Sequence, residues 1–305
     1  MTNTNTDKKP VLAVLGPTAS GKTALTLELA KRLNGVIINC DSRQIYEGML
    51  IGTASPTNEE KSVVPHMLFN FLSPDKQFNA SDYAFAAADA IKRVWSANQL
   101  PILAGGTGFY YSAISEGLGQ AGSDEKLAAE LQKELSEKGL EYMTDMLRKL
   151  DPEAAENVDI NNSRRVLRAI EIVKSTGRPF SQNQPKQLLP EAEFKPIVVT
   201  RPREELHRRI EERIDLMLKE GLENETLYIV NKYGRDAAAL SSIGYREFLD
   251  YFDRKITLEE VKEQILFHTR QYAKRQETWF RKKPGVAFTN LSEKSALEKC
   301  LASVA

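Results

Sequence analysis

The sequence predicts an α/β protein in which a parallel sheet flanked by helices carries an inserted helical domain. Three observations support this fold class. Short apolar runs end in polar or glycine-rich turns and alternate with segments of helical periodicity. A later stretch, 124–176, keeps the helical periodicity but contains no strand candidate. The chain of 305 residues is long enough for two domains, or for one domain with a large insertion.

Three apolar runs predict core strands at 11–15, 36–40 and 101–104. The first ends in a glycine-rich turn and is followed by a helix with one largely apolar side. The other two end at Asp41 and at Gly105. Strands that alternate with helices along the chain pair in parallel, and helices cover both faces of such a sheet.

The helical insertion is predicted to span 118–195, between core segments 1–117 and 196–305. Four prolines between 179 and 196 indicate a loop that leads back to the core, where 197–200 is a further β-type run. Helices are expected at 124–138, 140–150 and 163–175 in the insertion, and at 203–220, 222–233, 244–252 and 257–282 in the core.

Charge and cysteine content narrow the class of protein. Lys plus Arg and Asp plus Glu both total 42, which argues against binding nucleic acid through overall charge but allows a local basic patch. Two distant cysteines offer neither a disulfide scaffold nor metal-ligand spacing. The polar N-terminus lacks the apolar segment of a signal peptide, and no run of about 18 apolar residues occurs. We therefore expect a cytoplasmic protein without a membrane segment.

The glycine-rich turn carries the most specific motif of the chain. It matches G-x-x-x-x-G-K-[ST], and it lies between a predicted strand and a predicted helix, as a P-loop does. Backbone N–H groups of such a loop approach phosphate oxygens, Lys22 neutralises a terminal phosphate, and Thr23 can hold Mg²⁺. The sequence thus predicts a diphosphate- or nucleotide-binding site made of Gly16, Pro17, Thr18, Ala19, Ser20, Gly21, Lys22 and Thr23.

Asp41, at the end of the second apolar run, has two possible roles. It can hold Mg²⁺ through water beside the phosphate site, or it can act as a general base that accepts a proton from an attacking amine. Its position alone does not separate these roles. A structural role, the N-cap of a helix by Asp41 or Ser42, is a third interpretation.

Two further segments allow both a functional and a structural interpretation. The glycines of 105–110 (GGTGFY) permit either close approach to a ligand or a tight turn from strand to helix. On the helix through 268–282, Arg270, Lys274 and Arg281 share one face, and Tyr272 and Trp279 share another. This pattern suits single-stranded nucleic acid, but it is also typical of a solvated basic helix.

Taken together, the motifs resemble one family, the tRNA dimethylallyltransferases. The resemblance rests on GPTASGKT at 16–23, DSRQIYEGMLIGTASPT at 41–57, GGTGFYYSAI at 105–114, LDPEAAENVD at 150–159, SRRVLRAIEI at 163–172, SSIGYREFL at 241–249 and TRQYAKRQETWFR at 269–281. These segments occur in family order and cover nearly the whole chain.

The resemblance implies transfer of a dimethylallyl group from dimethylallyl diphosphate to the exocyclic amine of adenosine 37, next to the anticodon of tRNA. It implies a P-loop that holds the prenyl diphosphate with Mg²⁺ as the cofactor, and a monomeric enzyme of bacterial type. Asp41 is then the general base, Lys22 the cation on the leaving group and Thr107 a polar group near the reacting centre. The tRNA-binding residues implied are Asp41, Ser42, Arg43, Gln44, Asn161, Asn162, Ser163, Arg164 and Arg165.

Two other function classes share parts of this pattern. A P-loop small-molecule kinase has the same loop and core, but it needs an arginine-rich lid over ATP and no RNA surface. A non-catalytic RNA-binding P-loop protein is disfavoured because Lys22 and Asp41 are both present.

Overall fold

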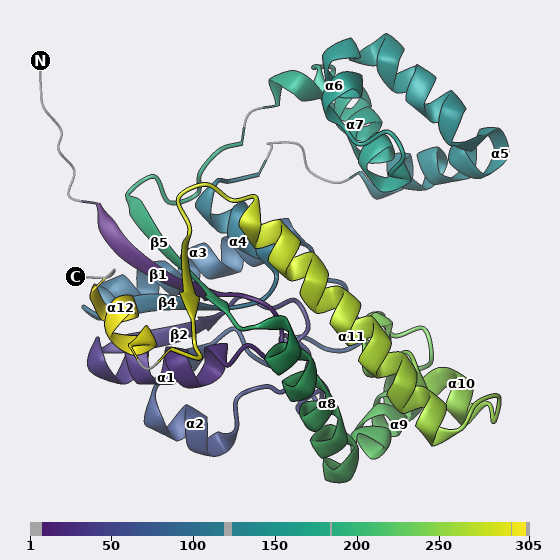
Figure 1. Ribbon diagram of the computed structural model, residues 1–305. Helices are drawn as coiled ribbons and strands as arrows, with labels where there is room; N and C mark the ends of the chain where they lie inside the picture. The colour runs from purple at the N-terminus through teal and green to yellow at the C-terminus, as the bar shows by residue number, and fades with distance from the viewer. Residues whose placement is uncertain (1–7, 119–123, 184, 294, 303–305) are drawn as a thin grey trace, which may run out of the picture. The chain divides into compact units, whose positions relative to one another are not determined.

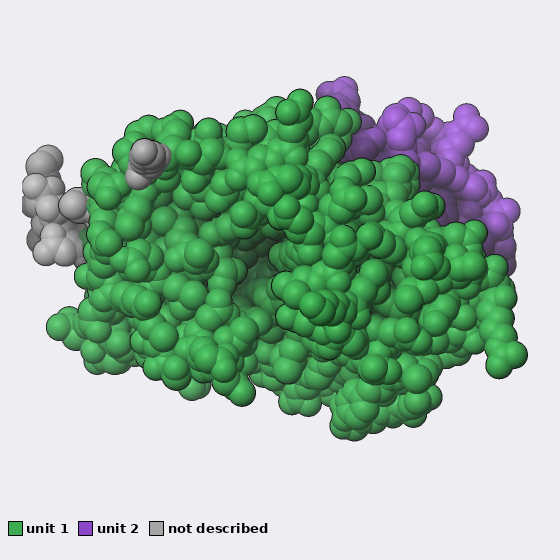
Figure 2. Space-filling view, turned by 60° about the horizontal axis from the view of Figure 1, so that its bottom comes forward, with its two compact units in different colours: residues 1–115, 188–305 green, residues 116–187 purple. Residues whose placement is uncertain are grey.

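The computed structural model describes residues 8–118, 124–183, 185–293 and 295–302. The chain divides into two compact units, one formed by 1–115 with 188–305 and the other by 116–187 (Figure 2). Residues 188–195, predicted to belong to the helical insertion, therefore belong to the larger unit. Within the described residues, no helix has the length and apolar character needed to cross a membrane.

A six-stranded sheet forms the centre of the larger unit, and every pairing in it is parallel. The predicted α/β fold class with a parallel sheet is confirmed. The strand order is β3-β2-β4-β1-β5-β6 (Figure 1). The strands are β1 (Lys9–Leu15), β2 (Gly35–Asn39), β3 (His66–Met67), β4 (Leu100–Gly105), β5 (Ala192–Thr200) and β6 (Ala287–Asn290).

Two of these strands, β3 and β6, were not expected from the sequence. They have only two and four residues and lie at the two edges of the sheet, so neither shows a fully buried apolar run. β5 begins at Ala192, four residues before the predicted start of the core segment. It pairs with β1 from Lys9↔Ala192 onward, and this pairing draws the residues before Pro196 into the sheet.

Helices cover both faces of the sheet, and every residue from Val11 to Leu15 is therefore buried. Leu12 and Val14 pack in one cluster with Leu29 of α1 and Cys300 of α12. The opposite face is covered by α3, which contacts β2, β4 and α4. These helices are α1 (Lys22–Arg32), α3 (Ala80–Ser96), α4 (Gly108–Ser115) and α12 (Ala296–Ala302).

Further helices extend the larger unit beyond the carboxyl ends of the strands (Figure 1). The long helices α8 and α11 pack against each other, and their buried residues share an apolar cluster with Ile45 and Met49. A capping box between Thr257 and Glu260 starts α11. These helices are α8 (Arg203–Glu220), α9 (Leu222–Tyr233), α10 (Phe248–Phe252) and α11 (Leu258–Arg281), whereas the short helix α2 (Asn58–Val63) contacts α1.

The smaller unit is helical and has its own apolar core, which includes Leu131, Leu147 and Ile170. Its helices are α5 (Glu125–Leu150), α6 (Pro152–Asn157) and α7 (Ser163–Thr176). The backbone of Gly139 is non-helical, with φ 81° and ψ 171°, so α5 is broken where the sequence predicts a boundary between two helices. Gly177 ends α7 in the left-handed conformation, two residues after the predicted end of this helix.

Candidate active site

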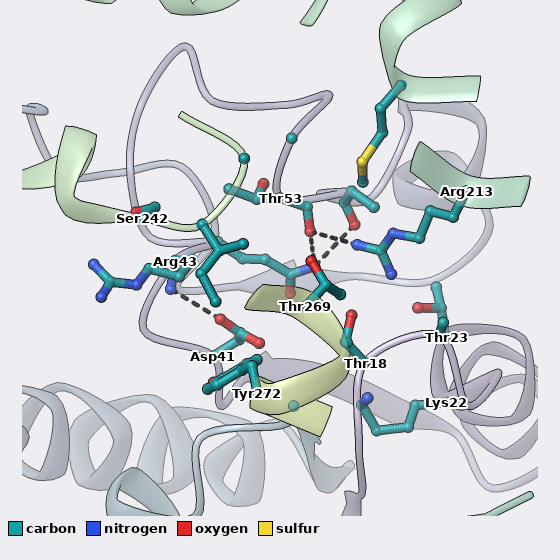
Figure 3. A pocket seen from close by; sticks show the side chains of 18 of the residues that line it. Thr18, Lys22, Thr23, Asp41, Arg43, Thr53, Arg213, Ser242, Thr269 and Tyr272 are labelled. Atoms are coloured by element: carbon teal, nitrogen blue, oxygen red, sulfur yellow. Dashed lines mark hydrogen bonds between the residues drawn. The ribbon is translucent and has the colours of Figure 1, made fainter. Parts of the chain in front are cut away.

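A cavity of about 360 Å³ in the larger unit brings together the P-loop, Asp41 and residues of α8 and α11 (Figure 3). Among its described lining residues, Asp41 is the one acid, whereas five are cationic. These cations are Lys22, Arg43, Arg213, Arg246 and Arg275. Such an excess of positive charge suits a polyanionic ligand.

The P-loop connects β1 to α1, as the motif requires. Gly16 has φ 144°, and a Cβ atom there would lie 2.5 Å from the Val199 carbonyl oxygen, so only glycine fits. Gly21, with φ 96°, forms the N-cap of α1. The Lys22 Nζ atom donates a hydrogen bond to the Pro17 carbonyl oxygen at 2.6 Å. Thr18, Lys22 and Thr23 all line the cavity.

The electrostatic environment of Lys22 is unusual for a lysine. Burial lowers its pKa from 10.5 to about 8, and the nearby Asp41 carboxylate opposes this shift while Arg213 adds to it. A cation with this pKa loses part of its charge near neutral pH unless an anion binds beside it.

Two arginine side chains from the C-terminal half of the chain donate hydrogen bonds to backbone carbonyl oxygens of the P-loop. The sequence analysis did not predict these contacts. Arg209 Nε donates to the Ala19 carbonyl oxygen at 2.9 Å, and Arg201 Nε donates to that of Ser20 at 2.7 Å. Ala19 is left-handed, with φ 61°, a strained conformation for a residue other than glycine. The bond from Arg209 helps to retain this conformation. No motif in the sequence signals these pairs, since 181 and 190 residues separate the partners.

Asp41 follows β2 and does not cap a helix, because residues 41–50 form turns. The N-cap interpretation of the sequence is therefore wrong. The buried Asn39 amide accepts from the Asp41 N–H at 2.8 Å and donates to the Asp41 carbonyl oxygen at 2.9 Å. Asp41 Oδ1 accepts from the Arg43 N–H at 2.9 Å. Within the described part of the chain, its other oxygen, Oδ2, has no hydrogen-bond partner.

Thr107 lies in the loop after β4, and its hydroxyl group contacts the segment that follows Asp41. Its Oγ1 atom accepts from the Ser42 N–H at 2.9 Å and lies 3.3 Å from the Ser42 Oγ atom. Its own N–H donates to the Cys40 carbonyl oxygen at 3.2 Å. Thr107 thus joins the loop after β4 to the loop after β2.

The glycines next to Thr107 are required by packing inside the protein. A Cβ atom at Gly105 would lie 2.0 Å from the Cys40 carbonyl oxygen, and one at Gly108 would lie 2.3 Å from the Trp279 ring. Packing against Cys40 and Trp279 therefore explains these glycines, and neither glycine has a left-handed backbone conformation. Close approach of a ligand is not needed to account for them.

Arg213 is a functional candidate that the sequence did not single out. It projects from α8 into the cavity, where its Nη2 atom donates to the Thr53 carbonyl oxygen at 3.3 Å (Figure 3). Burial lowers the pKa of Arg213 below the ordinary value of an arginine, and the Asp41 carboxylate opposes the shift. Ile210, Ile214 and Met217 on the same helix add an apolar wall to the cavity. The cavity therefore combines cationic and apolar lining residues.

The basic helix of the sequence analysis is the C-terminal part of α11, and its two aromatic residues are half-buried. Tyr272 lines the cavity, where burial raises its pKa to about 12, and Trp279 packs over Gly108. Arg270 pairs with Glu211 at 3.4 Å, whereas Lys274 and Arg281 are exposed. The basic face is retained, and its interleaving with aromatic residues for single-stranded nucleic acid stays a prediction.

The segments predicted to bind tRNA lie in different units. Asp41, Ser42, Arg43 and Gln44 are in the larger unit and are all partly buried, and the cavity is lined by all of them except Ser42. Asn161 to Arg165 are in the smaller unit, where the Asn162 side chain accepts from the Arg165 N–H at 3.3 Å and caps α7. Arg164 and Arg165 are exposed. Their proposed contacts with RNA stay predictions.

A parallel sheet with a P-loop after its first strand, and a cationic cavity beside that loop, define an α/β protein of the P-loop class. A family model described as IPP transferase matches residues 44–283. The chain belongs to this family, which confirms the resemblance found in the motifs.

Individual relatives agree with the family assignment over nearly the full chain. A tRNA dimethylallyltransferase of Acetivibrio thermocellus is 42% identical over 296 residues, covering 95% of each chain. The Bacillus subtilis protein of the same name is 39% identical over 293 residues, covering 94% of this chain and 93% of that protein.

Solved structures show the same fold. The tRNA isopentenylpyrophosphate transferase from Bacillus halodurans has a TM-score of 0.71 at 38% identity, covering 97% of this chain and 94% of that one. A eukaryotic dimethylallyltransferase that acts on tRNA has a TM-score of 0.80 at 26% identity, covering 96% of this chain and 77% of that one.

Proposed function

We propose that this protein transfers a dimethylallyl group from dimethylallyl diphosphate to the exocyclic amine of adenosine 37 in the anticodon loop of tRNA. The observation that carries the proposal is a single carboxylate, Asp41, in a cavity that also contains Lys22 and Arg213. The reaction needs cations for the leaving diphosphate and one proton acceptor for the attacking amine. Full-length relatives named for this activity support the assignment.

The leaving group is assigned to the P-loop side of the cavity. The amine nitrogen of adenine attacks the first carbon of the dimethylallyl group, the carbon–oxygen bond breaks, and its electron pair leaves with the diphosphate. Lys22, Arg213 and the N–H groups at the start of α1 stabilise the developing negative charge there. Diphosphate bound at this place also restores the full charge of Lys22, whose pKa burial lowers to about 8.

Mg²⁺ belongs to the proposal as a cofactor, and the residues present fit it. Mg²⁺ binds oxygen atoms, keeps several waters, and is commonly held by one or two protein groups together with substrate phosphates. The Thr23 hydroxyl group lines the cavity and would hold Mg²⁺ together with oxygens of the diphosphate. In the described residues, no cluster of three or more His, Cys, Asp or Glu side chains offers a site made of protein alone. Bound there, Mg²⁺ neutralises charge on the diphosphate.

Asp41 is assigned to the acceptor side of the reaction. Asn39 and the Arg43 N–H hold its backbone and one carboxylate oxygen, which leaves Oδ2 available to accept the proton that the amine loses. Adenine must leave its stack in the anticodon loop to reach the cavity, because a stacked base hides its amine. The proposal includes a monomer acting in the cytoplasm.

Mass spectrometry of nucleosides from tRNA incubated with the protein, dimethylallyl diphosphate and Mg²⁺ tests this function. We expect one added five-carbon unit on adenosine 37, and none on a matched tRNA with guanosine at that position. ATP, supplied in a parallel reaction, should not be consumed. Release of ADP in step with a phosphorylated product supports a small-molecule kinase instead and overturns the proposal.

Binding of the donor can be measured without turnover. Thermal unfolding should shift upward more with dimethylallyl diphosphate and Mg²⁺ than with ATP and Mg²⁺ at equal concentration, because at a given concentration the ligand with the lower Kd for the folded protein stabilises it more. A larger shift with ATP contradicts the donor assignment.

A further inference from the structure

The side chain of Gln276 connects two loops of the active site from the back. Gln276 lies on α11 and is 5% exposed. Its Oε1 atom accepts from the Thr18 N–H of the P-loop at 2.9 Å, and its Nε2 atom donates to the Gly106 carbonyl oxygen at 2.8 Å. One buried amide thus uses both its donor and its acceptor to join segments that are far apart in the sequence.

The two loops joined by Gln276 carry the two halves of the proposed chemistry. Thr18 belongs to the P-loop, which holds the leaving group through Lys22. Gly106 is next to Thr107, whose hydroxyl group accepts from the Ser42 N–H beside Asp41. A continuous series of contacts therefore runs from the P-loop through Gln276 and Thr107 to the segment of Asp41.

The space around Gln276 is tightly filled. A Cβ atom at Gly106 would lie 2.2 Å from the Gln276 Nε2 atom, so the glycine at this position accommodates the amide. Gln276 is not among the residues that line the cavity. It therefore acts on the cavity through Thr18 and Gly106 and does not touch a ligand in it.

We propose that Gln276 is a positioning residue for prenyl transfer, which sets the separation between the P-loop and the Asp41 segment. The inference rests on the proposed function. Attack by the amine on the dimethylallyl carbon requires the acceptor and the donor to be held at bonding distance, and a displacement of about 1 Å can cost about 10²-fold in rate. Binding of the donor alone needs only the P-loop and its cations.

Two substitutions separate the contributions of the amide. Gln276→Met has nearly the same shape but neither donates nor accepts in these two bonds. Gln276→Glu retains an acceptor for Thr18 but places an oxygen against the Gly106 carbonyl oxygen, where a donor is needed. Gln271→Met, an exposed position on the same helix, is the matched control.

Single-turnover transfer and donor binding are measured on wild type and the three variants. We expect Gln276→Met to reduce the transfer rate by about 10–100-fold while the Kd of dimethylallyl diphosphate, measured by calorimetry, changes less than about 3-fold. Gln271→Met should match wild type in both. A transfer rate for Gln276→Met within about 2-fold of wild type overturns the inference, as does a loss of donor affinity equal to the loss of rate.

The pH dependence of Gln276→Glu gives a second test, which does not depend on how well Gln276→Met folds. A glutamate buried here has its pKa raised above its ordinary value of about 4.3, and once protonated it can donate to the Gly106 carbonyl oxygen. The rate of Gln276→Glu relative to wild type should therefore rise as the pH falls from 8 to 6. A ratio that is constant with pH contradicts a role for the hydrogen bond that the Gln276 side chain donates to Gly106.

Wild-type protein in the same assay distinguishes a failure of the proposed function from a failure of the positioning role of Gln276. If wild type does not modify adenosine 37, the proposed function fails. If wild type is active and the Gln276 variants behave like Gln271→Met, only the positioning role fails.

Discussion

The Thr107 Oγ1 atom accepts a hydrogen bond from the backbone N–H of Ser42 at 2.9 Å. Thr107 follows β4 and Ser42 follows β2, so this bond joins the carboxyl ends of two neighbouring strands. Asp41 is adjacent to Ser42, and its carbonyl oxygen and N–H are held by Asn39. The position of the Asp41 carboxylate thus depends on bonds from both strands.

Removing the Thr107 hydroxyl group should reduce prenyl transfer through this bond. We expect Thr107→Val to lower the single-turnover rate by about 10-fold or more, because the Ser42 N–H loses its acceptor and the Asp41 segment can shift. Stability should fall by about 1 kcal/mol, measured by thermal unfolding. Thr107→Ser retains the hydroxyl group and should stay close to wild type. Full activity of Thr107→Val refutes any role for this hydroxyl.

Donor affinity should depend on pH through Lys22. Burial lowers the pKa of Lys22 to about 8, so in the free protein this cation is lost as the pH rises above 8. Because the charged form attracts the diphosphate, affinity for dimethylallyl diphosphate should weaken between pH 8 and 9.5. Calorimetry on wild type and Lys22→Met checks this expectation. If the affinity of Lys22→Met for dimethylallyl diphosphate declines equally with pH, a group other than Lys22 causes the effect.

Lys22→Ala should also slow turnover, because the leaving diphosphate loses a preorganised cation. A loss of about 10²–10³-fold is typical when one such group is removed. The rate is measured at saturating donor concentration, so that weaker binding does not contribute. Retention of more than about a tenth of the wild-type rate is incompatible with this role.

Asp41→Asn separates the general base from a Mg²⁺ ligand. The substitution keeps the size of the side chain and removes the proton acceptor, which typically costs about 10²–10⁴-fold in rate. If Asp41 is the base, donor affinity and the Mg²⁺ requirement should stay near those of wild type. Single-turnover rates and donor affinity, each measured over a range of Mg²⁺ concentrations, decide between the roles. Weak donor binding rescued by high Mg²⁺ assigns Asp41 to the metal.

The basic face of α11 should contribute to tRNA binding through phosphates. Removing charge at Lys274 and Arg281, which are exposed, should weaken tRNA binding and lower the salt slope by about one per lost phosphate contact. Arg270→Ala should weaken tRNA binding less than these substitutions do, because Arg270 already pairs with Glu211. Binding is measured by fluorescence anisotropy at several salt concentrations.

The matched control for this helix is Lys262→Ala. Lys262 lies nearer the start of α11 and pairs with Asp215, so its removal should leave the salt slope unchanged. Affinity for dimethylallyl diphosphate should be normal in all these variants. An unchanged tRNA affinity and slope after removal of Lys274 and Arg281 shows that the helix is merely solvated.

Features that depend on residues close together in the sequence could be predicted from the sequence alone. The buried run before Gly16 predicted β1, the glycine-rich turn predicted the P-loop, and Gly139 separated two helical segments. Each of these follows from backbone preference and apolar periodicity over a few residues. The short edge strands β3 and β6 lack such a pattern, and they were missed.

The tertiary structure decided which distant side chains complete the site. Arg213 and Arg209 come from one helix and Gln276 from another, and 258 residues separate Gln276 from Thr18. The sequence alone determined that a diphosphate loop and a carboxylate follow two core strands, because both are encoded in local segments. Whether a polar side chain faces water, a cavity or a buried carbonyl depends on how helices pack, and that packing is encoded by the whole chain. Gln276 therefore became recognisable only when α11 was placed against the P-loop.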